Sequence, residues 1–129
     1  MRLGLGGRIL VPLFHKAPLK AGRAVIHDDI RTLLDAPPTG AGAPSLDHIE
    51  HTLTSGYARA LALEAERRRI ERRLADVAAR LADETTNEYA SELGRLGQRL
   101  SLADDDLTNL RALLVSLRSR ADEVRATAA

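Results

Sequence analysis

Residues 45–129 of the chain read SLDHIEHTLTSGYARALALEAERRRIERRLADVAARLADETTNEYASELGRLGQRLSLADDDLTNLRALLVSLRSRADEVRATAA. Apolar or small side chains recur in this stretch at alternating steps of three and four residues, the spacing of a and d positions in a heptad repeat, and they do so for about five heptads on each side of residues 83–87. We call them seam positions. The first set is Leu46, Ile49, Leu53, Gly56, Ala60, Leu63, Arg67, Ile70, Leu74, Val77 and Leu81, and the second is Tyr89, Leu93, Leu96, Leu100, Ala103, Leu107, Leu110, Leu114, Leu117, Ala121 and Val124. The pattern predicts two long helices, each with one apolar seam.

The two seams lose phase between Leu81 and Tyr89. These residues are an a position and the following d position, and their separation of eight positions does not fit the expected spacing of three or ten. One straight helix cannot present both seams on the same side, so we expect a break here. Thr85 and Glu88 have the spacing of a capping box, which predicts that the second helix begins at this point.

A chain that folds back at this break brings the two seams together. Facing seam positions then have residue numbers that add up to 170, as Leu53 and Leu117 do, and each a position faces a d position. A shift of one heptad would keep this pattern, but 170 centres the turn on the capping residues. The sequence therefore predicts an all-α fold, a long antiparallel two-helix coiled-coil hairpin preceded by a short helix and a flexible N-terminal segment.

The charges beside the seams give mixed support for this register. The register makes Glu50–Arg118 and Arg80–Glu92 attractive, and it makes Glu64–Asp104, Glu66–Asp106 and Arg73–Arg99 repulsive. Each exposed pair contributes only a few tenths of a kcal/mol, whereas each buried Leu or Ile contributes roughly 1.5–3 kcal/mol. The seams therefore decide the prediction.

One rival to the two-helix hairpin is a second break at residues 98–101. Ser101 and Asp104 form another capping-box pattern there, which would give three helices in place of two. The seam passes through this region without losing phase, which favours one continuous helix.

The rest of the chain divides into short segments. We expect an irregular N-terminal segment at 1–22, a short helix at 23–35, a Pro/Gly linker at 36–44 and the hairpin at 45–129, with a helix at 45–83, a turn at 83–87 and a helix at 86–126. Ser45 is the expected cap of the first long helix. The short helix, with Val25, Ile26, Ile30, Leu33 and Leu34 on one side, either packs against the open end of the hairpin or stays loose.

Composition excludes several classes of protein. The chain has no cysteine, so it has neither a disulfide framework nor a thiolate metal site, and its net charge of +1 gives no general attraction to nucleic acid. The apolar run 9–14 is far shorter than the ~20 residues of a membrane span. Pro12 interrupts this run, which argues against a signal peptide. We expect a cytoplasmic protein that spans no membrane.

No catalytic set can be placed on this pattern. A two-helix rod offers no concave pocket, so we expect no enzyme activity, no cofactor and no small-molecule substrate. Asp47, His48, Glu50 and His51 put possible metal ligands within one helical turn, but acidic residues in a first turn also complement the helix dipole without a metal. We assign no metal site.

Four large apolar residues lie outside the seams: Leu61, Leu102, Leu113 and Val115. A two-helix coil buries one side of each helix only, so these side chains are candidates for binding a protein partner or a second copy of the hairpin. Packing by the short helix, or simple exposure to solvent, is the alternative.

The polar candidates are a basic run and one charged seam residue. Arg67, Arg68, Arg69, Arg72 and Arg73 form the run, which is interleaved with acidic residues and lacks aromatic stacking partners, so we do not expect nucleic-acid binding. Arg67 falls on the seam opposite Ala103 and close to Asp104 and Asp106. A polar seam position of this kind can fix the register of a coil.

The turn carries Asp83, Glu84 and Glu88, which would make the tip of the hairpin acidic. The segment from Asp83 to Tyr89 resembles the tip motif of bacterial transcript-cleavage factors of the Gre type, in which an Asp and a Glu precede a Glu-Tyr pair. Thr85 stands where that motif has its second acid. The resemblance implies a coiled-coil finger that enters RNA polymerase.

Together these features predict a non-enzymatic coiled-coil interaction or scaffold protein that binds a protein partner or itself. The alternative is a helical hairpin associated with nucleic acid or RNA polymerase, acting through the basic run or the acidic tip.

Overall fold

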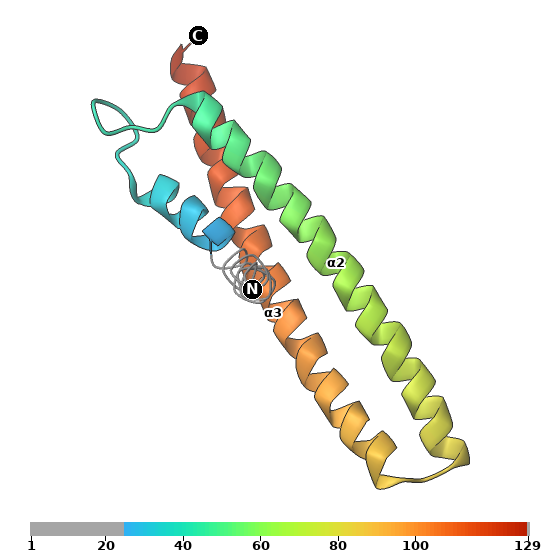
Figure 1. The fold of residues 1–129 in the computed structure, drawn as a ribbon. Helices are drawn as coiled ribbons and strands as arrows, with labels where there is room; N and C mark the ends of the chain where they lie inside the picture. The colour runs from blue at the N-terminus through green and yellow to red at the C-terminus, as the bar shows by residue number, and fades with distance from the viewer. Residues whose placement is uncertain (1–24, 129) are drawn as a thin grey trace, which may run out of the picture. The chain divides into compact units, whose positions relative to one another are not determined.

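The computed structural model describes residues 25–128. Within this range the chain forms three helices and no strand: α1 (residues 25–35), α2 (Leu46–Asp83) and α3 (Asn87–Ala128). α2 and α3 run in opposite directions and are joined by a short turn (Figure 1). The predicted all-α fold with an antiparallel hairpin of two long helices is confirmed. The expected irregular segment 1–22 and the first two residues of the expected helix 23–35 lie outside the described residues.

α3 is one uninterrupted helix of 42 residues. It passes through Gln98 and Ser101 without a break, so the rival prediction of a second break at 98–101 is wrong. The continuous apolar seam explains this, because a break would take the leucines on either side of it out of phase.

The first turn of each long helix is capped by a hydroxyl. The His48 amide donates to Ser45 Oγ at 3.1 Å, as expected for the start of α2, and the Tyr89 amide donates to Thr86 Oγ1 at 3.1 Å at the start of α3. The prediction that Thr85 caps the second helix is therefore wrong by one residue. The Thr85 hydroxyl donates instead to the Leu81 carbonyl at 3.4 Å, in the last turn of α2.

The chain divides into two compact units, which are described separately below. Unit 2 is Gly56–Ser116 and holds the turn. Unit 1 extends up to Ser55 and resumes at Leu117, so it combines α1, the start of α2 and the end of α3.

The core of unit 2 is built from seam positions. Ile70, Val77, Leu96 and Ala103 form a buried cluster, and Leu74, Tyr89, Leu93 and Leu100 pack against it. Ion pairs between α2 and α3 lie at the sides of this core: Arg67–Asp104, Arg73–Glu92 and Arg111–Glu64. In each pair the two residue numbers add up to within five of 170, which is the register that the seams predict.

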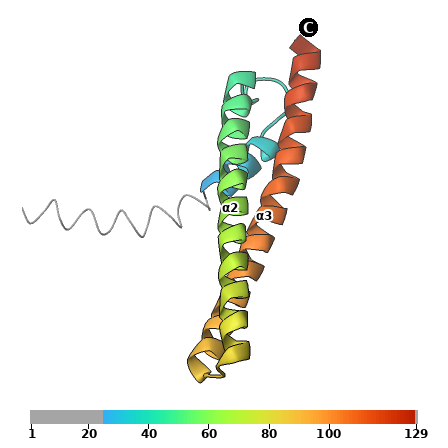
Figure 2. The same ribbon diagram turned by 90° about the vertical axis from the view of Figure 1, so that its right-hand side faces the viewer.

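Unit 1 contains the docking site of α1. Its buried side chains come from all three helices: Ile26, Ile30 and Leu33 of α1, Ile49 and Leu53 of α2, and Leu117 and Ala121 of α3. Both views show α1 beside the C-terminal part of α3 (Figure 1 and Figure 2). Of the two outcomes expected for the short helix, the structure shows the packed one.

Arg120 of α3 connects directly to the end of α1. Its guanidinium donates to the carbonyls of Leu33 at 3.4 Å, Leu34 at 3.2 Å and Ala36 at 3.5 Å. The last carbonyls of a helix have no partner within that helix and carry the negative end of its dipole. A cation from another helix therefore caps α1.

Candidate interaction groove

A groove of about 510 Å³ lies between α2 and α3 in unit 2. Its floor consists of Ala60 and Leu114, which are seam positions with 9% and 3% of their surface exposed. Most other seam positions of α2 carry a larger aliphatic side chain than Ala60 does. The small alanine leaves a depression in the surface of the hairpin.

The walls of the groove are large apolar side chains. Tyr57 and Leu61 of α2 and Val115 of α3 line it, with 41%, 66% and 68% of their surface exposed. Tyr57 and Leu61 are four residues apart and so lie on one side of α2. Exposed apolar residues are ordinary when they are scattered, but a contiguous group of them is a candidate interaction surface.

An ion pair closes one end of the groove. Arg111 Nη2 of α3 donates a hydrogen bond to Glu64 Oε2 of α2. These two side chains line the groove together with the apolar walls, and they satisfy each other's charge. The predicted register placed Glu64 opposite Asp104, which would be repulsive. In the structure Asp104 pairs with Arg67 at 3.4 Å and Glu64 pairs with Arg111, so neither acid faces the other.

The structure brings together two of the four predicted partner-binding residues. Leu61 and Val115 face the same groove, whereas Leu102, with 63% of its surface exposed, and Leu113, which is half-buried, do not line it. Tyr57 was missed by the sequence reasoning. The signal for it was available, because an aromatic residue one helical turn before an off-seam leucine extends the same apolar stripe.

The polar seam residue Arg67 pairs with Asp104, the residue that follows the buried Ala103. Its Nε atom is buried and makes no hydrogen bond. Asp104 remains half exposed to water, so the pair is only partly desolvated.

The rest of the basic run is spread over the surface of α2. Arg68, Arg69 and Arg72 are exposed, and Arg73 pairs with Glu92 of α3 at 2.8 Å, where the sequence suggested Arg80 as the partner of that glutamate. Three arginines from two helices, Arg69, Arg73 and Arg99, line a second, smaller groove of about 200 Å³.

The acidic tip residues surround the turn of unit 2. Asp83 ends α2, Glu84 follows it, and Glu88 lies in the first turn of α3. All three are exposed.

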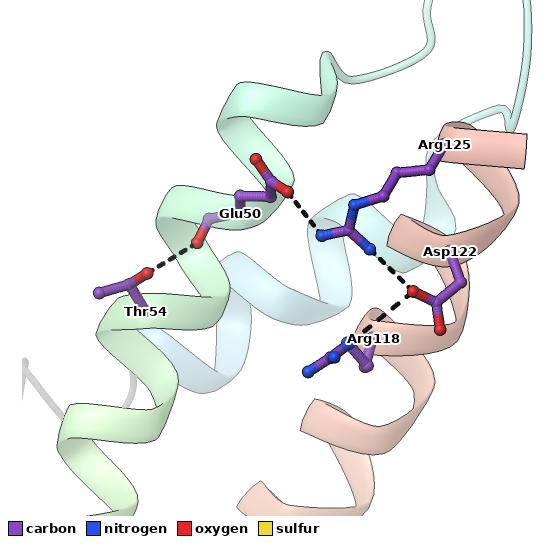
Figure 3. Close-up of polar contacts among 5 residues, drawn as sticks. All are labelled: Glu50, Thr54, Arg118, Asp122 and Arg125. Atoms are coloured by element: carbon purple, nitrogen blue, oxygen red, sulfur yellow. Dashed lines mark hydrogen bonds and ion pairs between the residues drawn. The ribbon is translucent and has the colours of Figure 1, made fainter. Parts of the chain in front are cut away.

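The candidate metal ligands near the start of α2 are not assembled into a site. Glu50 accepts a hydrogen bond from Arg125 at 2.5 Å, and Arg125 also donates to Asp122 at 2.8 Å (Figure 3). Arg125 lies one heptad after Arg118, which the sequence suggested as the partner of Glu50. His48 and His51 are exposed. Across residues 25–128, no three His, Cys, Asp or Glu side chains are grouped so that they could hold a metal ion.

No protein-family model matches the chain, and no curated protein or solved structure is similar to it. Within the part of the chain that the structure describes, no helix has the length and apolar character that crossing a membrane requires.

Proposed function

We propose that this chain is a non-enzymatic coiled-coil interaction protein, and that the groove at Tyr57, Leu61 and Val115 receives a helix of a protein partner. The observation that carries the proposal is the gathering of three large exposed apolar side chains over a buried floor in one groove. Burying one such side chain contributes roughly 1.5–3 kcal/mol. Tyr57, Leu61 and Val115 still expose 41%, 66% and 68% of their surface, so a partner that covers them would gain a corresponding part of this energy.

The form of the groove favours a helix as the occupant. It runs between two antiparallel helices, and a third helix packs into such a groove with its own ridge of side chains at an interaxial distance of about 8–10 Å. A helix with apolar residues at positions i, i+3, i+4 and i+7 would fill the apolar walls. Arg111 and Glu64 would border it and contribute to specificity at the rim.

The lining of the groove supports binding rather than turnover. Its only charged side chains, Glu64 and Arg111, neutralise each other. The proposal assigns the chain no substrate and no cofactor, and makes it a scaffold that holds its partner along the coil.

Site-specific photocrosslinking in the native host tests this function. A photoreactive amino acid at Leu61 is expected to give one discrete covalent adduct, and the same amino acid at Arg72, an exposed position of α2 that does not line the groove, is expected to give none. No adduct from Leu61, or equal adducts from both positions, would contradict the proposal.

A second candidate function is binding to the phosphate backbone of a nucleic acid. It is favoured by the convergence of Arg69, Arg73 and Arg99 on one groove, although Arg73 already pairs with Glu92. Binding of this kind depends steeply on salt concentration. A mobility-shift experiment with DNA and RNA at low salt decides the matter, because an Arg69→Ala/Arg99→Ala variant must lose any shift that these guanidinium groups cause.

A further inference from the structure

α2 carries a stripe of side chains that continues from the groove towards the turn. Residues at alternating steps of four and three lie on one side of a helix. The stripe consists of Tyr57, Leu61, Glu64, Arg68, Glu71, Ala75, Ala78 and Ala82. Seven of these residues are exposed and Glu64 is half-buried, and all of them belong to unit 2.

The two halves of the stripe complement each other in size and charge. The half near the groove holds the large residues Tyr57 and Leu61, and the half near the turn holds only alanines beyond Glu71. A positive charge, Arg68, and a negative charge, Glu71, lie at the middle. Two copies of the stripe that run in opposite directions would therefore match large residues with small ones and positive charge with negative charge.

We propose that the helix received by the groove is α2 of a second copy of this chain, packed antiparallel across a two-fold axis between Arg68 and Glu71. This inference rests on the proposed function and names its partner. A two-fold axis perpendicular to the helices reverses the direction of α2 and places it on its own copy. The facing pairs are then Tyr57 with Ala82, Leu61 with Ala78, Glu64 with Ala75, and Arg68 with Glu71, each occurring twice.

The side chains that face each other favour this register. At the axis Arg68 of each copy meets Glu71 of the other, and no hydrogen bond or ion pair within residues 25–128 engages either side chain. A shift of one heptad in one direction sets Leu61 against Glu71. The opposite shift takes Leu61 past Asp83, where α2 ends. The first of these shifts also forms two ion pairs, between Glu64 and Arg68, so charge alone does not separate the two registers. Side-chain size does, because only the proposed register sets Leu61 against an alanine.

The sizes of the side chains allow close approach. Leucine and tyrosine facing alanine give the alternation of large and small residues that packs two helices without voids. On α3, the part of the same face near the turn also carries residues without a side chain. Gly94 lies three heptads from Val115, and Gly97 lies two heptads from Arg111. Apart from the chain neighbours and the nearby backbone of α3 itself, no atom lies within 4 Å of the point where a Cβ would stand at either glycine.

Disulfide trapping tests the pairing and its direction, and the absence of cysteine from the chain makes it clean. Two variants of the full chain are prepared, Leu61→Cys and Ala78→Cys. In one chain these positions are 17 residues apart on α2, which is about 25 Å at 1.5 Å per residue and far beyond the reach of a disulfide. Oxidation of an equal mixture is expected to give a covalent dimer, at least tenfold more than either variant gives alone.

Light scattering on the unmodified chain provides the second measurement. The chain is expected to have twice the mass of one chain at high protein concentration, and Leu61→Asp is expected to have the mass of one chain with unchanged helix content. Equal cross-linking by the mixture and by each single variant would overturn the antiparallel register. A single-chain mass at all concentrations would overturn the inference.

The two proposals fail in different ways. If the purified chain stays monomeric while a photoreactive group at Leu61 still captures a different protein, the proposed function stands and the second copy is excluded. If neither experiment gives a product, both proposals are excluded.

Discussion

At the scale of single residues, Arg67 shows how a charged side chain fits into an apolar seam. Its guanidinium reaches the side of the core and pairs with Asp104, while its Nε atom stays buried without a partner. A Leu at this position would bury more apolar surface and leave no polar atom unsatisfied. We infer that Arg67 helps to fix the register of the two helices, because it reaches Asp104 only when the numbers of facing residues add up to about 170.

The two threonines of the turn give a matched pair for a prediction. Thr86 accepts the Tyr89 amide and caps α3, whereas Thr85 donates to a carbonyl of α2 that also accepts solvent hydrogen bonds readily. Thr86→Ala is expected to lower the free energy of unfolding by about 1 kcal/mol, the usual contribution of an N-cap. Thr85→Ala is expected to lower it by only a few tenths of that. Urea denaturation measures both, and equal effects would contradict the assignment of the cap.

The sequence could identify Leu61 and Val115 as residues outside the seam, because periodicity alone separates them from it. It could not identify the groove. The two residues lie on different helices, and which off-seam residues meet depends on the register and on the depression left by Ala60. Leu102 had the same sequence signature and yet lies elsewhere on the surface.

At the scale of helices, α1 is stabilised by its neighbours. The described part of α1, residues 25–35, is too short to form a stable helix alone in water. Its buried side chains Ile26, Ile30 and Leu33 supply the apolar contact, and Arg120 supplies the cap at its C-terminal end.

Arg120→Ala is therefore expected to loosen α1 selectively. Loss of charge-assisted hydrogen bonds to partly buried carbonyls is expected to lower the free energy of unfolding by about 1–3 kcal/mol. Hydrogen exchange should accelerate in residues 25–35 while residues 56–116 keep their protection. Arg72→Ala, which changes an exposed arginine of α2, is the control and is expected to alter neither quantity.

The short helix itself was predictable from its apolar spacing, but its position was not. Arg120 lies 86 residues after Leu34, whose carbonyl it binds, and no local pattern connects two residues so far apart. The capping residue of α3 was mispredicted for a different reason. Thr85 and Thr86 are adjacent and chemically alike, so spacing alone cannot decide which hydroxyl faces the first turn.

At the scale of the whole molecule, the all-α class and the two long helices were predictable because one simple property determines them. Seam residues at heptad spacing are expected to be buried, and in the structure each of them is buried or half-buried. Leu63, Ile70, Val77, Leu107 and Leu117 each have 2% or less of their surface exposed. The mixed charge pairs did not decide the outcome. In the structure Glu92 pairs with Arg73, and Glu50 pairs with Arg125. Each of these arginines lies one heptad away from the arginine that the sequence suggested as the partner.

Leu107→Asp tests whether the seam holds the molecule together. Leu107 has 1% of its surface exposed, and a carboxylate there would be buried without a partner. The variant is expected to lose most of its helical signal in far-UV circular dichroism, while Arg72→Ala keeps it. A fully helical Leu107→Asp protein would show that the seam is not the main source of stability.

The contact between Arg120 and α1 also bears on how the chain is made. Protein synthesis proceeds from the N-terminus at roughly 5–20 residues per second, and Arg120 follows the α1 carbonyls that it binds by 84 to 87 residues. Isoleucines of α1 therefore emerge from the ribosome roughly 4–17 s before their docking surface exists. During that interval they are open to chaperones and to neighbouring nascent chains, and the start of the described chain reaches its native place only after Arg120 has been synthesised.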